Sequence, residues 1–425
     1  MTGNVVVALI TLVGSVCAGN AAPNYGVPPL AIACQRGDEA RVKSLLDAGA
    51  DVNATLNGGE SMLMVASRTG KPGPVKLLLA KGAQVDAHDR REQTALMWAA
   101  AEGHAEVVNL LIKAGADVRA RLNSGFTPLL FAVREGRIEV VKALINAGVD
   151  VNEATTVEKS MSALLLAEEN GHYELAVVLL EAGANANDER SGARPLHHIA
   201  RVRKPNRGDG EDGSPPPQGS GKLTSLDFVR ALVKHGAGVN APRKQGSSGK
   251  GGMGTRRATP FMFAAKTADV PLMKLLIELG ADPMKPNADG ATPLMVAAGL
   301  ATTAPDEEAG TEDECLEAVK LLLDLGADVN TVDKNGETAM HAAAYKSLPK
   351  MVTFLAEHGA KMDVWNHKNK SGWTPLMIAE GFRVGNFKPS VATIAAIHQV
   401  MRAAGMTPPP PTPRTAEKPG KYKPN

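Results

Sequence analysis

Two adjacent histidines, His197 and His198, are the one local cluster in this sequence that could bind a metal ion. Imidazole nitrogens are common ligands of transition metals. Adjacent residues of a helix point in different directions, however, and no third ligand with suitable spacing follows or precedes the pair. The sequence therefore predicts no metal site, and it indicates no other cofactor.

Motifs that carry catalytic chemistry are absent from the sequence. It has no Gly-rich phosphate loop after a strand, no Cys-x-x-Cys or His-Glu-x-x-His spacing, and no Gly-x-Ser-x-Gly turn. Outside the repeats described below, no stretch is long enough to fold as a catalytic domain. We therefore predict that the protein is not an enzyme and has no catalytic residues.

Two groups of basic residues could meet the phosphates of a nucleic acid or another anion. The first contains Arg201, Arg203, Lys204 and Arg207, and the second contains Arg243, Lys244, Lys250, Arg256 and Arg257. No aromatic side chain is interleaved to stack on bases, and 47 Lys and Arg against 45 Asp and Glu create no global field. A solvated loop explains both groups equally well, so nucleic-acid or anion binding through these loops is the alternative hypothesis.

A pattern with a period near 33 residues organises the chain. The position occupied by Pro128 recurs, and defines repeats one to ten, at Pro29, Met62, Ala95, Pro128, Ala163, Pro195, Pro260, Pro293, Ala339 and Pro375. Thr before this position can cap a helix, and Pro is tolerated at a first helical residue. Later glycines such as Gly136 and Gly148 stand where a first and a second helix must end. Each repeat is therefore predicted to be a pair of helices.

This pattern resembles the ankyrin repeat, and the resemblance covers about nine-tenths of the chain. It implies an all-α solenoid of about ten helix-turn-helix repeats with β-turn fingers, spanning residues 23–405. The position two residues after the first helical residue, commonly His in the family, is mostly apolar here, with Met in five repeats. The next position is apolar in nine of the ten repeats, which predicts that its members, Trp98 among them, lie in the core.

Three insertions interrupt repeats six and eight. Those near 201–222 and 241–257 belong to repeat six and are rich in Gly, Pro and Ser, so they are expected to be mobile loops. The third, near 299–316, separates the two helices of repeat eight and is acidic. The Pro-rich, basic residues 406–425 are predicted to form a disordered tail.

The N-terminal residues resemble a signal peptide. An apolar run at 5–16 is followed by small residues at 18–22, which predicts a mature chain beginning between Gly19 and Pro23 and a periplasmic or secreted protein. The run is too short to span a bilayer. Residues 1–22 contain no Lys or Arg, so a cytoplasmic protein with a hydrophobic cap on its first repeat is the alternative, and lipidation of Cys17 ranks third.

Cysteine usage indicates no disulfide framework. Without the N-terminal segment only Cys34 and Cys315 remain, and they belong to the first and eighth repeats. A disulfide requires Cα atoms within about 7 Å, so these two cysteines are predicted not to pair within one molecule. Stability must then come from packing.

The resemblance implies a function in binding an unidentified protein partner, by a chain that is monomeric on its own. Members of the family that bind partners commonly use the finger tips and the exposed, concave side of the inner helices. Transferred to this chain, those positions are Arg90, Arg91, Gln93, Glu102, Asn123, Phe126, Arg134 and Glu135 in repeats three and four, and Lys334, Asn335, Tyr345, Lys346, Lys370, Trp373 and Phe382 in repeats nine and ten. Tyr345, Trp373 and Phe382 are predicted anchors, since aromatic residues are frequent hot spots. Trp373 and Phe382 could instead only cover the last repeat, which has no following neighbour.

Overall fold

The computed structural model describes residues 27–413 except 157–159, 207–215, 245, 247–253, 301, 306 and 386–387. In these residues it has 21 helices, and β-pairing is limited to isolated bridges within finger loops, which confirms the predicted all-α class. The chain divides into two compact units. The first comprises the described residues up to Ala99 and His104–Asp117, and the second comprises Ala100–Gly103 and the residues from Val118 onward.

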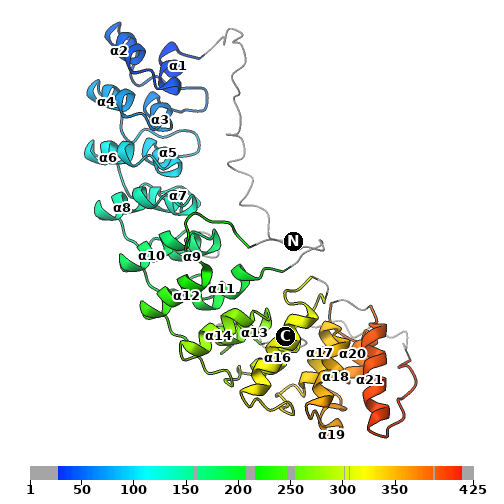
Figure 1. Cartoon of the computed structure of the whole chain (residues 1–425). Coiled ribbons are helices and arrows are strands. Elements are labelled where there is room, and N and C mark those ends of the chain that lie inside the picture. Colours follow the sequence, from blue (N-terminus) through cyan, green and yellow to red (C-terminus); the bar gives the residue numbers. More distant parts are fainter. Residues whose placement is uncertain are drawn as a thin grey trace. The chain divides into compact units, whose positions relative to one another are not determined.

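The first unit contains alternating inner and outer helices. They are α1 (Pro29–Arg36), α2 (Glu39–Asp47), α3 (Met62–Ser67), α4 (Pro72–Ala80), α5 (Ala95–Glu102, whose last residues belong to the second unit) and α6 (Ala105–Lys113). The inner helix α1 packs on the inner helix α3, and the outer helix α4 packs on α2 and α6. Inner helices therefore stack on inner helices and outer helices on outer helices, as Figure 1 shows.

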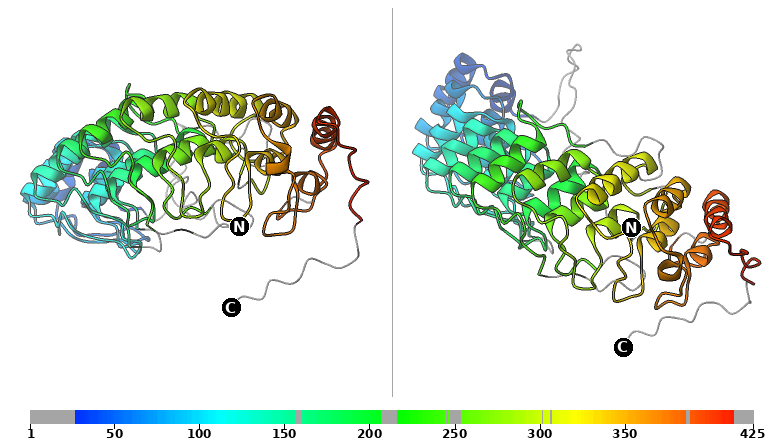
Figure 2. Two further views of the ribbon diagram at one scale, coloured as in Figure 1. Left: turned by 90° about the horizontal axis from the view of Figure 1, so that it is seen from below. Right: turned by 60° about the horizontal axis from the view of Figure 1, so that its bottom comes forward.

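The second unit continues the same alternation. Its helices are α7 (Pro128–Arg134), α8 (Ile138–Asn146), α9 (Ala163–Glu169), α10 (Tyr173–Glu181), α11 (Pro195–Arg203), α12 (Ser225–Lys234), α13 (Pro260–Lys266), α14 (Val270–Glu278), α15 (Pro293–Ala297), α16 (Glu312–Asp324), α17 (Ala339–Lys346), α18 (Pro349–Glu357), α19 (Met362–Trp365), α20 (Pro375–Ala379) and α21 (Val391–Ala403). Inner helices from α7 to α20 contact one another in sequence, whereas the short α19 lies within a finger. The outer helices also contact one another in sequence, except that between α12 and α14 the contact is an ion pair of Arg230 with Glu278 at 3.1 Å. Figure 2 shows the resulting two layers of helices.

The repeat sequence explains where the helices begin and end. The hydroxyl of Thr127 accepts a hydrogen bond from the Leu130 N–H, and Pro128 follows as the first helical residue of α7. Thr259, Thr292, Thr338 and Thr374 cap α13, α15, α17 and α20 in the same way. Gly148 after α8 has a φ of 85°, a conformation that other residues rarely adopt. The predicted caps and left-handed helix ends are confirmed.

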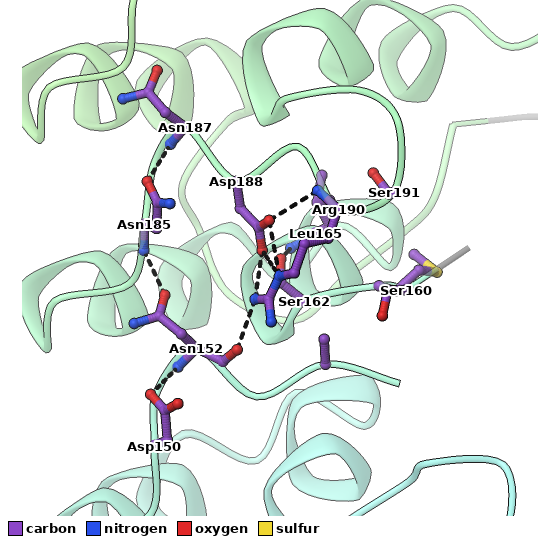
Figure 3. Close-up of polar contacts among 12 residues, drawn as sticks. Asp150, Asn152, Ser160, Ser162, Leu165, Asn185, Asn187, Asp188, Arg190 and Ser191 are labelled. Carbon is purple, nitrogen blue, oxygen red and sulfur yellow. Dashed lines mark hydrogen bonds and ion pairs between the residues drawn. The ribbon is translucent and has the colours of Figure 1, made fainter. Parts of the chain in front are cut away.

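Asparagine side chains connect the ends of successive repeats (Figure 3). The side-chain oxygen of Asn152 accepts from the Asn185 N–H at 2.8 Å, and its Nδ2 donates to the Gly183 carbonyl at 3.5 Å. The same two contacts to the next repeat are made by Asn53, Asn187, Asn240 and Asn330. One amide therefore satisfies a donor and an acceptor of the neighbouring turn, which fixes the start of the finger in these five repeats.

The described residues of the first insertion contact repeat five, and the mobility of the loop stays a prediction. Residues 201–203 belong to helix α11. After the segment 207–215, which lies outside the described residues, the Ser220 N–H donates to His172 Nδ1 at 2.9 Å and the Lys222 N–H to Glu174 Oε1 at 2.6 Å. At Gly219 a Cβ would lie 2.0 Å from the Gly171 carbonyl oxygen, so only glycine fits this approach. The insertion thus folds back onto repeat five.

The other insertions are also partly structured. In the second, the Arg243 N–H donates to the Ala258 carbonyl and the Arg257 N–H to the Arg243 carbonyl, both at 2.9 Å, while 245 and 247–253 lie outside the described residues. In the third, residues from Glu312 onward form the first turn of α16, with Thr311 as a capping box. Lys204 of repeat six reaches Glu314 of that turn at 2.5 Å. This ion pair joins two repeats, six and eight, that are not neighbours in the sequence.

The start of the C-terminal tail also makes contacts in the described residues 406–413, and the disorder of the tail stays a prediction. The Thr412 N–H donates to Glu380 Oε1 at 3.3 Å, and Asn366 Nδ2 lies 3.5 Å from the Met406 sulfur. Residues 414–425 lie outside the described part of the chain. Cys34 and Cys315 are both buried and free, as predicted.

Candidate partner-binding surface

The predicted residues of the first unit lie on a finger. Arg90 and Arg91 are exposed and Gln93 is half-buried. The Arg90 N–H donates to the Gly58 carbonyl of the preceding finger at 3.0 Å, and Asp89 Oδ1 accepts from the N–H groups of Arg91 and Gln93. This buried carboxylate holds the finger in one conformation and leaves the two arginine side chains in solvent.

A tryptophan that was predicted to belong to the core lies partly at the surface of this unit. Trp98 of α5 is only half-buried, and the guanidinium carbon of Arg68 lies 5.5 Å from the centroid of its ring. Such a cation–π pair is common where an aromatic side chain reaches solvent. The core prediction is therefore wrong for Trp98, and also for Ile32, Val65 and Phe263, which are half-buried at the same repeat position.

In the second unit, three predicted binding residues lie close together. They are Phe126, Arg134 and Glu135, and they are joined by Phe131, which the sequence analysis assigned to the core. The guanidinium carbon of Arg134 lies 5.3 Å from the ring centroid of Phe126 and 5.2 Å from that of Phe131. The two rings are 5.3 Å apart, and Arg134 Nε donates to Glu135 Oε1 at 2.8 Å. We call these four residues the repeat-four cluster.

The side chains of the repeat-four cluster hold one another in place, and one nitrogen of Arg134 has no hydrogen-bond partner among the described residues. Arg134 is 21% exposed, and its Nη2 is buried without a hydrogen-bond partner among the described residues. Arginine and aromatic side chains held in place lose little conformational entropy on binding, and both are frequent hot spots. Of the other predicted residues nearby, Asn123 is exposed at the tip of the preceding finger, and Glu102 is half-buried at the end of α5.

In repeats nine and ten, backbone hydrogen bonds connect the predicted finger residues to the preceding finger. The Lys334 N–H donates to the Asp289 carbonyl and the Lys370 N–H to the Asn335 carbonyl, both at 2.8 Å. Both lysine side chains are exposed, whereas Asn335 is half-buried. The backbone contacts hold three successive fingers together.

Two of the predicted binding residues are buried, so the expectation that they are exposed is wrong. Tyr345 is 3% exposed, and its hydroxyl donates to Glu337 Oε1 at 3.1 Å. Lys346 is 5% exposed, and its Nζ donates to the Ala309 carbonyl of the third insertion at 2.5 Å. The insertion covers the side of α17 that an uninterrupted repeat would leave open.

The other two predicted anchors are intermediate in solvent exposure. Trp373 and Phe382 are both half-buried, Trp373 at the end of a finger and Phe382 just after α20. Asn369 holds the finger of Trp373, because its side-chain oxygen accepts from the Trp373 N–H at 3.0 Å. Partial exposure agrees with either role, that of a binding residue or that of a cover for the last repeat.

The first group of basic residues is largely neutralised within the chain. Arg201 pairs with Glu169 at 3.2 Å, Arg203 with Asp269 at 2.6 Å, and Lys204 with Glu314. Arg207 and Lys250 lie outside the described residues. These ion pairs leave little charge on this group for the phosphates of a nucleic acid.

The two histidines have separate surroundings. His198 Nδ1 lies 3.1 Å from the buried carboxylate of Glu168, whereas His197 Nε2 faces the Ala258 carbonyl at 3.3 Å. In the part of the chain that the structure describes, no three His, Cys, Asp or Glu residues are grouped so that they could hold a metal ion.

Comparison with known proteins agrees with this architecture. A family model for ankyrin repeats in three copies matches residues 2–89, 63–155 and 309–387, which together make up more than half of the chain. The chain therefore belongs to the ankyrin-repeat family, whose members generally act as non-enzymatic modules for protein–protein interaction. None of the helices in the described ranges is long and apolar enough to cross a membrane.

The similarity to three individual proteins covers short segments of each. The chain is 35% identical over 88 residues to the bovine protein fem-1 homolog A, which is 21% of this chain and 14% of that protein. It is 34% identical over 76 residues to the target of rapamycin complex 2 subunit AVO2 of Saccharomyces cerevisiae, 18% of each chain. It is 29% identical over 160 residues to neurogenic locus notch homolog protein 1 of Xenopus tropicalis, 37% of this chain and 5% of that protein. The matched segments thus span less than a fifth of each of these relatives.

Proposed function

We propose that this protein is a non-catalytic scaffold that binds a partner protein through its fingers and the exposed sides of its inner helices. The repeat-four cluster is the observation that carries the proposal. The Arg134 guanidinium lies against two aromatic rings, and its side chain is 21% exposed. A partner carboxylate would bind the exposed part of this side chain while apolar groups cover the half-buried Phe126 ring. The chain is a monomer in the absence of its partner.

The test is an affinity measurement with the partner captured from the source cells. Arg134→Ala and Phe126→Ala are each expected to weaken binding by about 30-fold, the effect of a typical hot spot of about 2 kcal/mol. The matched control is Lys142→Ala, on the outer helix α8 of the same repeat, where Lys142 is exposed and pairs only with Glu139. That variant should bind within about twofold of the wild type.

Thermal melting distinguishes a binding role from a structural one. If Arg134→Ala lowers the melting temperature but leaves the affinity intact, the cluster only stabilises repeat four and the proposed binding site is wrong. Salt dependence tests the alternative function, since binding through phosphate contacts weakens steeply with salt and binding through a partly apolar interface does not.

We further propose that the protein is exported and that residues 1–22 are removed. The supporting observation is the apolar run at 5–16 followed by small residues, all of which lie outside the described residues. N-terminal sequencing of the protein from the extracellular or periplasmic fraction should find a first residue between Gly19 and Pro23. Recovery of Met1 on exported or soluble material would refute the cleavage.

A further inference from the structure

Three apolar side chains of the first unit form a row that reaches solvent. Ile32 of α1, Val65 of α3 and Trp98 of α5 occupy the same position in repeats one, two and three, and all three are half-buried. We call them the apolar row. Figure 1 shows α1, α3 and α5 stacked in that order. The equivalent Phe131 and Leu166 of repeats four and five are only 4% and 6% exposed, so the apolar row ends at repeat three.

Two exposed arginines border the apolar row. Arg36 follows Ile32 by four residues and Arg68 follows Val65 by three, so each arginine lies on the same side of its helix as the apolar residue. The guanidinium carbon of Arg68 lies 5.5 Å from the centroid of the Trp98 ring, which places this charge at the row itself. Neither arginine forms an ion pair with an acidic side chain in the part of the chain that the structure describes. Both charges are therefore available to a partner.

The inner helices of this unit add no negative charge. The sequences of α1 and α3 contain no Asp or Glu, and neither do residues Ala95–Ala99, the part of α5 that belongs to this unit. The tip of the finger before α5 has two exposed arginines, Arg90 and Arg91. The exposed Glu92 lies beside them, and Glu60 of the preceding finger is half-buried. Positive charge thus predominates around the apolar row.

The spacing of the apolar row suits an extended chain. Stacked helices lie about 8–10 Å apart, so neighbouring members of the row are separated by about this distance. In a polyproline-II segment every third side chain is on the same face, and these side chains are about 9 Å apart. Side chains on one face of a β-strand are only about 7 Å apart. A segment of about seven residues with an apolar side chain at every third position therefore matches the row.

We propose that this face binds an acidic, extended segment of a partner protein that has an apolar residue at every third position. The apolar residues pack on Ile32, Val65 and Trp98. Carboxylates between them accept hydrogen bonds from Arg36 and Arg68, where charge-assisted bonds are strong. A nucleic acid would supply negative charge but no apolar side chains for the row. This proposal rests on the proposed function for the class of partner, and it concerns residues outside the repeat-four cluster.

Binding of synthetic nine-residue peptides to the full chain, measured by the fluorescence anisotropy of a dye on the peptide, tests the proposal. The probe has leucine at its second, fifth and eighth positions and glutamate at the others. It is expected to bind at least fivefold more tightly than a peptide of the same composition with leucine at every second position, and at least tenfold more tightly than a peptide with lysine in place of glutamate. Equal binding of the two glutamate peptides would show attraction by charge alone and would overturn the proposal, as would a lack of binding.

Variants of single arginines assign the binding to this face. Arg68→Gln and Arg36→Gln are each expected to weaken binding of the probe at least fivefold, because each removes one charge beside the apolar row. Arg41→Gln is the matched control, since Arg41 is exposed on the outer helix α2 of the same unit, and it should change the affinity less than twofold. All three variants should melt within about 2 °C of the wild type, because exposed substitutions rarely change stability by more than about 0.5 kcal/mol. Equal losses for Arg41→Gln and Arg68→Gln would contradict the proposed site.

Other occupants give different results. An oligouridine of the same net charge that binds more tightly than the probe would overturn the proposal in favour of a nucleic acid. Self-association of the full chain that Arg68→Gln abolishes would show instead that a second copy of the chain covers the apolar row. The peptide measurement does not use the captured partner, so its failure and a failure of the test with Arg134→Ala are distinguishable.

Discussion

Replacing Arg203 with methionine should lower the free energy of unfolding by about 3 kcal/mol, since removing one partner of a buried ion pair leaves an uncompensated charge. The guanidinium of Arg203 donates to both carboxylate oxygens of Asp269, at 2.6 and 3.0 Å. Asp269 is 1% exposed, and it also caps α14 through the Leu272 N–H. Methionine preserves the volume of the side chain but cannot neutralise this carboxylate. Urea unfolding monitored by circular dichroism measures the loss.

The control lies two residues away on the same helix. Arg201 pairs with Glu169, but both side chains are largely exposed, so Arg201→Met should cost less than about 1 kcal/mol. Combining Arg203→Met with Asp269→Asn should recover part of the stability, because asparagine can still cap α14 without a buried charge. Similar, small losses for the two methionine variants would contradict the assignment of Arg203–Asp269 as a buried pair.

Replacing Glu337 with glutamine should stabilise the protein by about 3 kcal/mol at pH 8 and have little effect near pH 4. Burial, reinforced by the nearby Asp333 charge and opposed by hydrogen bonds from Tyr345 and Asn369, raises the pKa of Glu337 to about 7. The unfolded chain has the ordinary glutamate value near 4.3. The folded state therefore holds a proton that the unfolded state releases, and this contribution to stability is fully present below pH 4 and is lost as the pH rises through 7.

The measurement is the free energy of unfolding of both proteins between pH 4 and pH 9. Glutamine keeps a side-chain oxygen that can accept from the Tyr345 hydroxyl and from Asn369 Nδ2, which contact Glu337 at 3.1 and 2.8 Å. The difference between variant and wild type should grow across pH 5–8. Glu357→Gln, at an exposed position on α18, serves as the control and should give a constant difference. A constant difference for Glu337→Gln as well would disprove the raised pKa.

The helix pairs could be predicted because their signals are local. A threonine before a first turn, such as Thr127, caps its helix within three residues, and a glycine such as Gly148 ends the next helix through its own backbone. Both signals recur with the repeat, so one copy supports the next. Three of the four residues of the repeat-four cluster could be predicted from the same regularity, because Phe126 lies in the finger before α7 and Arg134 and Glu135 lie at the end of α7. The fourth, Phe131, was assigned to the core.

The rest depends on contacts between residues far apart in the sequence. Burial of Tyr345 and Lys346 follows from the third insertion, whose Ala309 carbonyl reaches Lys346 across 37 positions. The pairing of Lys204 with Glu314 joins residues 110 positions apart, and no periodicity indicates it. Trp98 is partly exposed although its position is apolar in nearly every repeat, because the row along the inner helices reaches solvent in some repeats. A sequence pattern alone cannot distinguish an apolar row that is buried in every repeat from one that reaches solvent in some repeats.

The ion pair between Lys204 and Glu314 has a mechanical consequence. In an array where each repeat touches only its neighbours, a pulling force on one end can detach repeats singly, with a low barrier at each step. Here Lys204 of repeat six forms an ion pair with Glu314 of repeat eight and donates a hydrogen bond to the Ala268 carbonyl of repeat seven at 3.2 Å. A force applied at the C-terminus must therefore also break this partly exposed ion pair, worth about 1 kcal/mol or less, before repeat eight separates from repeat six. Force spectroscopy should show a slightly higher force for this step in the wild type than in a Lys204→Met variant.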